Sequence, residues 1–276
     1  MKNDKNEDVP IVDKSGKFVK EIIDFAGLQV KAFSDVEGLT TDEQISIKLK
    51  KENKAFDVKK YEHSYPHCWR TDKPILYYPL ESWFINSTKL KDDFINKNKD
   101  INWQPESTGT GRFGNWLENL VDWNLSRSRF WGTPLPIWRT KDGKDEICIG
   151  SINELKSEIK KSVDLGFMKN NISDNIDLHR PFVDEIILAS KEGSPMYRET
   201  DIIDVWYDSG SMPFAQYHYP FENKDVFDKM FPAKFIAEGV DQTRGWFFTL
   251  HAISIMLFGK VSYENVISNG LSLIHI

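Results

Sequence analysis

The sequence has 276 residues, of which 40% are hydrophobic and 13% aromatic, enough for one large or two smaller hydrophobic cores. This composition excludes a chain that is disordered throughout, and the formal net charge of −6 argues against an overall basic nucleic-acid binder. The longest apolar run, at 246–258, is too short and too interrupted to span a bilayer, so no membrane partner is expected.

The N-terminal residues are charged and contain no apolar run of the kind found in signal peptides. The sequence has two cysteines, Cys68 and Cys148, which lie far apart. This usage fits a reducing compartment better than a disulfide framework. We therefore expect a cytoplasmic protein.

The first third of the chain predicts few regular elements. Apolar residues on both sides of a Lys14–Gly16 turn indicate a hairpin within 9–18, and a helix is expected at about 41–53. Thr41 and Gln44 are predicted to form its capping box. Residues 75–85 are rich in aromatic and β-branched side chains, which favours a strand, with Pro79 placing it at a sheet edge or a break.

The middle of the chain alternates surface segments with short elements. Residues 86–100 are rich in Lys, Asn and Asp and predict a solvated helix or loop, and a helical repeat follows at 116–120. Prolines 134 and 136 then force an extended strand towards Trp138. Residues 140–200 are expected to form a small insertion that contains a helix at about 152–162, capped by Ser151 and Glu154.

Residues 201–215 form one of two segments that suggest a ligand site. Trp206, Tyr207 and Asp208 precede Ser209–Gly210, which we interpret as a turn whose backbone amides face a ligand. Taken alone, Trp206 fits a buried structural residue better than a ligand contact. Paired with Trp246, it would close an apolar slot.

The second segment, 234–246, carries more information than any other part of the chain. Residues 235–237 and 266–267 read as buried strands with a helix between them, which makes a β-α-β unit. The helix is expected to face a sheet with one apolar stripe, made by Trp246, Leu250, Ile253 and Leu257. A parallel crossover leaves ligands at the carboxyl ends of its strands, so Glu238–Gly239 and Asn269–Gly270 should lie side by side at a crevice.

The residues of this crevice suit an ammonium group on an apolar body. Glu238 and Asp241 attract a cation, Gln242 adds an amide, and the indole of Trp246 provides an apolar wall and cation–π attraction. Asp241 could instead be only a helix cap, and Trp246 only part of the core. The clustering of these residues favours the ligand site.

Arg127 and Arg129 are the best candidates for a local basic patch, with Arg112 nearby in sequence. Such arginines can contact nucleic-acid phosphates even in an acidic protein. They can also be solvated or paired with neighbouring acids. The sequence leaves both alternatives open.

Four segments together resemble the middle of an isoleucyl-tRNA synthetase, a class I aminoacyl-tRNA synthetase. They read YPHCWRTDKP, DWNLSRSRFWGTPLP, DVWYDSGSMPFA and EGVDQTRGWFF. The resemblance implies an α/β fold that contains the second half of a Rossmann domain. It places the later part of an inserted connective, or editing, domain at residues 1–110. Residues 111–276 would be the return into the catalytic domain, with the small insertion at about 140–200.

The resemblance also implies a function for the two site segments. Such enzymes activate isoleucine with ATP and Mg²⁺, transfer it to tRNA(Ile), and edit misactivated valine. The side chain of isoleucine would lie between Trp206 and Trp246. The aminoacyl-adenylate would contact the matching positions Glu238, Gly239, Asp241 and Gln242. Asn269 and Gly270 would lie near adenine, Arg127 and Arg129 would contact tRNA, and the intact enzyme is expected to be a monomer.

The chain departs from the family pattern at several points. The HIGH and KMSKS motifs, which serve ATP in the family, are not in the sequence. We therefore assign no catalytic residue and expect this chain alone to be inactive. Thr71 stands where relatives often have a second zinc-binding cysteine near Cys68, so no zinc is expected. The final LSLIHI does not continue the family pattern, and we expect it to be adaptor-derived rather than native.

A non-catalytic, aromatic-rich module that binds RNA or carbohydrate is the alternative function. It would use tryptophans such as Trp83, Trp116, Trp131 and Trp206 as stacking platforms. These residues are spread among apparently unrelated elements, so core packing explains most of them. A glycosidase is a weaker alternative, since no pair of acids is seen at suitably spaced strand ends.

Overall fold

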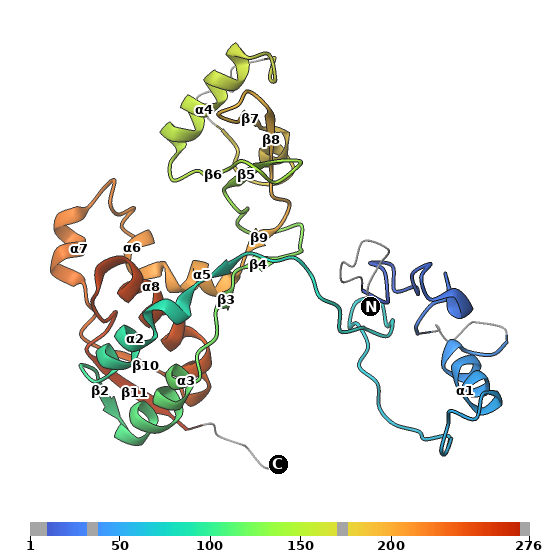
Figure 1. The fold of residues 1–276 in the computed structure, drawn as a ribbon. Coiled ribbons are helices and arrows are strands. Elements are labelled where there is room, and N and C mark those ends of the chain that lie inside the picture. The colour runs from blue at the N-terminus through green and yellow to red at the C-terminus, as the bar shows by residue number, and fades with distance from the viewer. Residues whose placement is uncertain (1–9, 32–37, 170–175, 271–276) are drawn as a thin grey trace. The chain divides into compact units, whose positions relative to one another are not determined.

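The computed structural model describes residues 10–31, 38–169 and 176–270. The chain forms two compact units, Met1–Glu81 and Ser82–Ile276 (Figure 1). The division falls before the domain boundary expected at about residue 110, so residues 82–110 belong with the second unit. The LSLIHI end lies outside the described residues.

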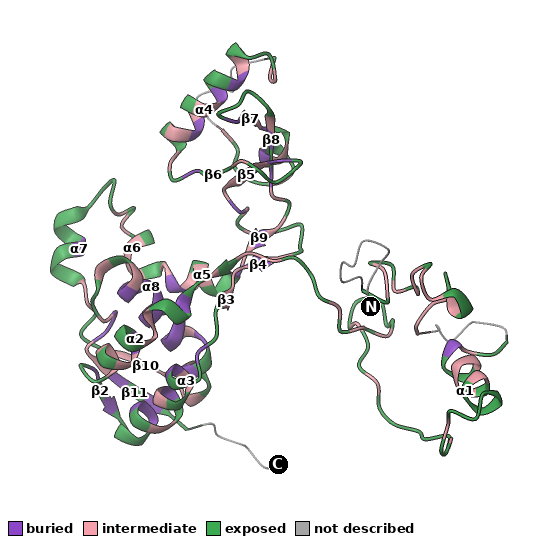
Figure 2. Ribbon diagram, viewed as in Figure 1, coloured by how far each residue is buried: buried purple, intermediate pink, exposed green. Residues whose placement is uncertain are grey.

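The first unit contains little regular structure. Val12 and Phe18 form an antiparallel bridge, which confirms the predicted turn between them, and a short 3₁₀ helix spans Ile23–Phe25. Helix α1 spans Thr41–Lys51 and is mostly exposed or half-buried (Figure 2). The predicted capping box was wrong by one residue. Thr40 is the N-cap and exchanges hydrogen bonds with Glu43.

The Thr41 side chain is occupied elsewhere, which explains this shift. Its hydroxyl donates to the carbonyl of Gln29 at 2.6 Å, and the residue is buried. The more exposed Thr40 side chain is therefore the one that accepts from the helix N-terminus, through the backbone N–H of Glu43.

The predicted strand at 75–85 is also largely wrong. Only Phe84–Ile85 is a strand, β1, and it pairs with β3, Trp123–Asn124, in antiparallel fashion. A strand forms only where a second backbone pairs with it. High β-propensity in 75–83 therefore produced extended chain without a sheet.

A three-stranded parallel sheet lies at the centre of the second unit. Its order is β10 (Ile236–Gly239), β11 (Asn265–Asn269) and β2 (Asn102–Gln104). The predicted β-α-β unit is confirmed, because 3₁₀ helix η5 (Val240–Arg244) and α8 (Trp246–Phe258) connect β10 to β11. Parallel strands require such a crossover.

Helix α8 is buried on more sides than its sequence indicated. Residues 247–255 are all buried, whereas Leu257, the last member of the predicted stripe, is 56% exposed. The helix contacts α2 (Lys91–Asn98) and α5 (Val205–Gly210). Figure 2 shows these buried residues gathered along α8 and the adjoining strands. The single-stripe prediction was therefore too narrow.

The remaining core elements lie on either side of β2 in the sequence. The 3₁₀ helix η2 (Ser87–Leu90) precedes α2, and a π-helix, η3 (Thr108–Phe113), runs directly into α3 (Gly114–Glu118). The core they share with α8 and the sheet is strongly aromatic. Its largest fully buried members are Phe94, Phe113, Leu117, Phe247, Tyr263 and Val266.

The segment expected to be a small insertion has its own hydrophobic core. Four antiparallel strands in the order β6-β5-β8-β7 pack against α4 (Ile152–Asp164). The strands are β5 (Ile137–Thr140), β6 (Glu146–Cys148), β7 (Ile187–Ala189) and β8 (Pro195–Arg198). Trp138, Leu155, Ile159 and Leu188 lie in this core. The 3₁₀ helix η4 (Phe182–Glu185) precedes β7.

Two strands lead to and from this segment. Strand β4 (Ser126–Arg127) pairs with β9 (Ile202–Ile203), after which the chain forms α5, α6 (Met212–Ala215) and α7 (Lys224–Met230). The predicted Ser209–Gly210 turn was wrong. Ser209 and Gly210 are the last residues of α5, because Asp204 caps this helix and starts it before Trp206.

His251, in the middle of α8, gives the second unit a pH-dependent stability. It is fully buried, and its Nε2 donates to the carbonyl of Phe94 at 2.9 Å. Burial lowers the pKa of His251 to about 4. The stabilisation is therefore complete above the ordinary pKa of about 6.5 and is lost as pH falls towards 4.

We predict that the free energy of unfolding falls by about 2 kcal/mol between pH 7 and pH 5 through this residue alone. His251→Gln, which keeps a donor but cannot be protonated, should remove that part of the loss in urea titrations at both pH values. His218→Gln, at an exposed position beside Glu222, should not. Equal pH dependence of wild type and His251→Gln would contradict this account.

Candidate functional site

The candidate site lies at the carboxyl ends of β10 and β11. Gly239 is in register with Asn269, and Glu238 with Ser268. Glu238 and Gly239 are half-buried, whereas Asn269 and Gly270 are exposed. The predicted juxtaposition of these two strand ends is therefore confirmed.

Helix η5 begins directly after β10 and carries the amide and the second acid. Gln242 Oε1 accepts from the backbone N–H of Trp246 at 2.8 Å, and its Nε2 donates to Asp241 at 3.3 Å. The side chain that caps α8 is therefore Gln242, and not Asp241 as the alternative reading of the sequence allowed. The Asp241 residue stays exposed.

The sequence did not identify the contact that fixes η5. Thr243 is fully buried, and its hydroxyl donates to the carbonyl of Val240 at 2.8 Å and accepts from Arg112 Nε at 3.0 Å. Arg112 lies on η3, the helix that follows β2, so the loops after β10 and β2 are joined here. No spacing pattern could have shown this, because the two residues are far apart in sequence.

Trp246 connects α8 to α5. Its indole is half-buried, and Nε1 donates to the carbonyl of Ser209 at 2.9 Å. The two helices can approach because Gly210 has no side chain. A Cβ at this position would lie 2.8 Å from Ile253 Cδ1 and 3.0 Å from the Thr249 backbone.

Trp206 lies close to the same point, on the first turn of α5. A Cβ on Gly245 would be 3.2 Å from the Trp206 ring and 2.6 Å from Gln242 Oε1. Trp206 is 41% exposed, so part of its indole remains free. The structure thus brings Trp206, Gln242 and Trp246 together around one glycine.

Asp204 holds α5 in this position. It is 4% exposed and accepts from Arg127 Nη2 at 2.8 Å, from Trp123 Nε1 at 3.1 Å and from the backbone N–H of Trp206 at 3.3 Å. Arg127 also donates to the carbonyl of Asn124 at 2.9 Å. Of the two alternatives for Arg127, pairing with an acid is the one observed.

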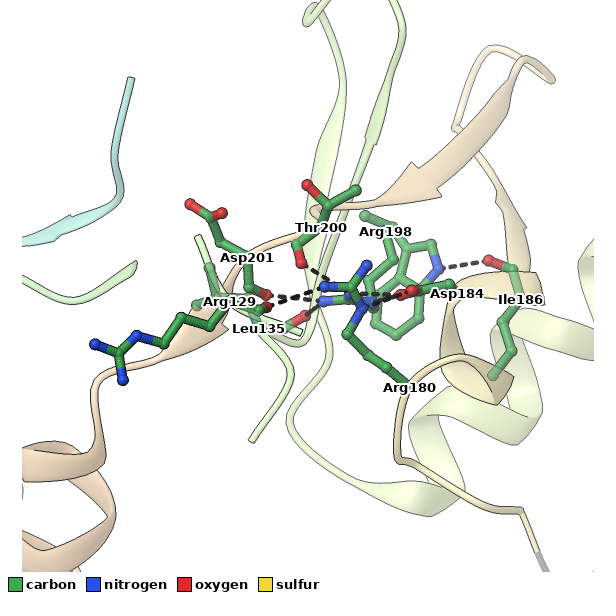
Figure 3. Close-up of polar contacts among 9 residues, drawn as sticks. Arg129, Leu135, Arg180, Asp184, Ile186, Arg198, Thr200 and Asp201 are labelled. Carbon is green, nitrogen blue, oxygen red and sulfur yellow. Dashed lines mark hydrogen bonds and ion pairs between the residues drawn. The ribbon is translucent and has the colours of Figure 1, made fainter. Parts of the chain in front are cut away.

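Arg129 differs from Arg127 in its surroundings. The residue is exposed, and its guanidinium points away from the charged cluster around Asp184 (Figure 3). Arg129 and Arg112 are thus the exposed members of the predicted basic patch, whereas Arg127 is half-buried.

The acid on α5 has a perturbed ionisation. Burial raises the pKa of Asp208, although the Thr133 hydroxyl, which donates to its carboxylate at 3.1 Å, opposes the shift. Repulsion from Asp204 adds to the increase. Asp208 lies on the same helix as Trp206, two residues after it.

The tryptophans of the alternative reading do not form one surface. Trp116 packs edge-on against Phe248 beside the core, with ring centroids 5.9 Å apart, whereas Trp131 is 71% exposed. Trp83 lies within 5.6 Å of the Arg139 guanidinium, away from both. Core packing accounts for Trp116, as the sequence indicated.

Within 10–31, 38–169 and 176–270, no group of three or more His, Cys, Asp or Glu side chains could hold a metal ion. In the same residues, no helix is both long and apolar enough to cross a membrane.

Comparison with known proteins identifies the family of the chain. Residues 19–274 match the family model described as tRNA synthetases class I (I, L, M and V). The chain therefore belongs to the class I tRNA synthetases, in the group specific for isoleucine, leucine, methionine and valine. It is a mixed α/β protein, in agreement with the fold expected from the sequence.

Within this group, the most similar curated relatives share one specificity. The chain is 63% identical to the isoleucine–tRNA ligase of Cytophaga hutchinsonii, over 99% of this chain and 26% of that protein. It is 55% identical to the isoleucine–tRNA ligase of Bacteroides thetaiotaomicron, over 99% of this chain and 28% of that protein. It is 48% identical to the isoleucine–tRNA ligase of Clostridium acetobutylicum, over 96% of this chain and 24% of that protein. The chain thus spans about a quarter of the length of these relatives.

One solved structure illustrates how partial the coverage is. The methionyl-tRNA synthetase of Mycobacterium tuberculosis, bound by methionyl-adenylate, is 14% identical, with a TM-score of 0.39 over 74% of this chain and 29% of that one. This similarity is too low to bear on individual site residues.

We predict that Asp204→Ala lowers the free energy of unfolding by about 2–3 kcal/mol, because it removes a helix cap and leaves the Arg127 charge without its partner. Chemical denaturation followed by tryptophan fluorescence measures this. Asp201→Ala is the control, since its carboxylate points away from the neighbouring charged cluster (Figure 3) and its removal should cost less than about 0.5 kcal/mol. Equal effects of the two substitutions would show that the Asp204 contacts do not hold α5.

Proposed function

We propose that this chain is the central part of an isoleucine–tRNA ligase, and that the β10–η5–α8 crevice binds isoleucyl-adenylate. One observation carries the proposal. Trp206 and Trp246, which sequence resemblance assigns to the isoleucine pocket, both lie beside Gly245, at the end of the η5 helix that directly follows β10 and its Glu238. The names of the relatives support the same specificity.

The proposed contacts follow from the charge and exposure of each group. Glu238 and Asp241 supply negative charge for the ammonium group of isoleucine and acceptors for the ribose hydroxyls. Gln242 Oε1 already accepts from Trp246, so its Nε2 is the group available to a ligand. Gly239 and Gly270 permit close approach of a ligand to the backbone, and we assign adenine to the neighbourhood of Asn269 and Gly270, as the resemblance implies.

The reaction proposed is attack of the isoleucine carboxylate on the α-phosphate of ATP, with pyrophosphate as the leaving group. Isoleucine is then transferred to a terminal ribose hydroxyl of tRNA. Positioning and charge stabilisation, rather than a protein nucleophile, serve this chemistry. Mg²⁺ accompanies ATP, and the HIGH and KMSKS motifs that serve it are not in this sequence. We therefore propose that this chain alone does not activate isoleucine.

The other proposed assignments concern editing and tRNA. The first unit would belong to the connective insertion that removes misactivated valine, which the resemblance extends to about residue 110, although residues 82–110 pack with the second unit. Such a step is needed because isoleucine and valine differ by one methylene group, and an apolar pocket discriminates only weakly between side chains that differ so little. The isoleucyl enzyme itself is the standard example of this limit. Arg129, which faces solvent, would contact tRNA phosphates.

We predict that Trp246→Ala weakens binding of a non-hydrolysable isoleucyl-adenylate analogue by about 10- to 100-fold, because it removes one apolar wall and the contact to α5. Calorimetry should show a much smaller loss for an adenosine nucleotide without the amino acid. Trp69→Ala, at an 84% exposed position of the first unit, is the control and should bind like wild type. Equal losses for both ligands would remove Trp246 from the isoleucine pocket.

A further inference from the structure

Residues 129–132 expose aromatic side chains instead of burying them. Trp131 is 71% exposed and Phe130 is 58% exposed, although two hydrophobic cores lie in the same unit. Neighbouring exposed aromatic rings are a feature of binding surfaces more than of ordinary solvent-facing loops. This loop is therefore a candidate interaction site outside the β10–η5–α8 crevice.

The loop is held in place by specific contacts. Arg180 Nη1 donates to the carbonyl of Arg129 at 3.1 Å, and the same guanidinium lies 4.9 Å from the centre of the Phe130 ring. On the other side, Gly132 packs directly on Ile202, where a Cβ would come within 2.4 Å of the Ile202 side chain. The loop is thus fixed both to the segment before η4 and to β9.

A buried charge cluster in turn fixes Arg180 (Figure 3). Asp184 accepts from Arg180 Nε at 2.7 Å and from Arg198 Nε at 2.7 Å. Arg198 has a side chain that is 1% exposed and also donates to the carbonyls of Leu135 and Asp201. Burial would raise the pKa of Asp184, but the two arginines hold it below its usual range. The carboxylate therefore stays charged at neutral pH and keeps Arg180 oriented.

Trp131 is stacked on one side only. Its ring lies 5.5 Å from that of His179, with an angle of 7° between the planes. His179 Nδ1 lies 2.9 Å from Asp177 Oδ1, which restrains the imidazole. With 71% of the residue exposed, an indole whose one face is covered by His179 has its other face open to solvent.

We propose that Trp131, supported by His179 and flanked by the exposed Arg129, is a stacking platform for a base at an unpaired end of an RNA. This inference rests on the proposed function, which supplies an RNA substrate. An aromatic face binds any base, and an adjacent guanidinium attracts the phosphate that follows it. A guanidinium binds a charged phosphate more strongly than a neutral sugar hydroxyl, so the combination fits RNA better than an oligosaccharide.

The rigid support of the loop strengthens the argument. Binding to a mobile aromatic side chain would have to order that side chain, whereas the Asp184 cluster and the His179 stack have already done so. Arg180, Asp184 and His179 are therefore positioning residues, and Trp131 is the residue that contacts the base.

The test compares two RNA hairpins binding to the 276-residue chain, one blunt and one with four unpaired nucleotides at its 3′ end. Fluorescence anisotropy should show that Trp131→Ala weakens binding of the overhang hairpin by about 5- to 150-fold. Binding of the blunt hairpin should weaken by less than about two-fold. Trp131→Phe, which keeps a ring, should restore most of the loss. Trp69→Ala, the matched exposed tryptophan, should leave both affinities unchanged.

Several outcomes would overturn the inference. They are no preference of wild type for the overhang, equal effects of Trp131→Ala and Trp69→Ala, and tighter binding of an oligosaccharide that depends on Trp131. Circular dichroism must show that Trp131→Ala is folded, and Asp184→Asn, which should weaken overhang binding while Trp131 is intact, provides the second variant. If the isoleucyl-adenylate analogue still binds normally to Trp131→Ala, failure of the platform leaves the proposed function standing.

Discussion

The close contact between α5 and the beginning of α8 determines the geometry of the candidate site. It is possible because Gly210 and Gly245 lack side chains, and a Cβ at either position would meet atoms within 3 Å. The hydrogen bond from Trp246 Nε1 to Ser209 then holds the two helices together. As a consequence, two tryptophans that are 40 positions apart in the sequence lie beside the same glycine, Gly245.

Arginine–aspartate pairs, each with one buried member, connect this contact to the rest of the second unit. Asp204 and Arg127 anchor the start of α5, and Asp184 and Arg198 anchor the loop that precedes β5. An unpaired charge in such places is strongly destabilising, so each pair fixes the relative position of segments distant in sequence. Such pairs hold a proposed pocket and a proposed RNA platform in place without contacting either ligand.

The sequence predicted the parts of the structure that depend on local pattern. The β-α-β unit and its strand ends follow from short apolar runs and a helix between them, and the small segment around α4 follows from its turn and cap residues. The sequence did not predict the features that depend on contacts between residues far apart in the chain. Residues 75–83 have no pairing strand, the 201–215 segment is helical because Asp204 caps it, and Arg112 reaches Thr243 across the sheet loops. A competing hydrogen bond to Gln29 similarly moved the cap of α1 by one residue.

The central claim is that Trp206 and Trp246 together enclose the side chain of isoleucine. Transferred nuclear Overhauser effects between the methyl groups of a bound isoleucyl-adenylate analogue and selectively labelled indole protons test this directly, even for weak binding. The account predicts cross-peaks from these methyl groups to the rings of both Trp206 and Trp246. Cross-peaks to other tryptophans, such as Trp83 or Trp138, with none to this pair, would contradict it.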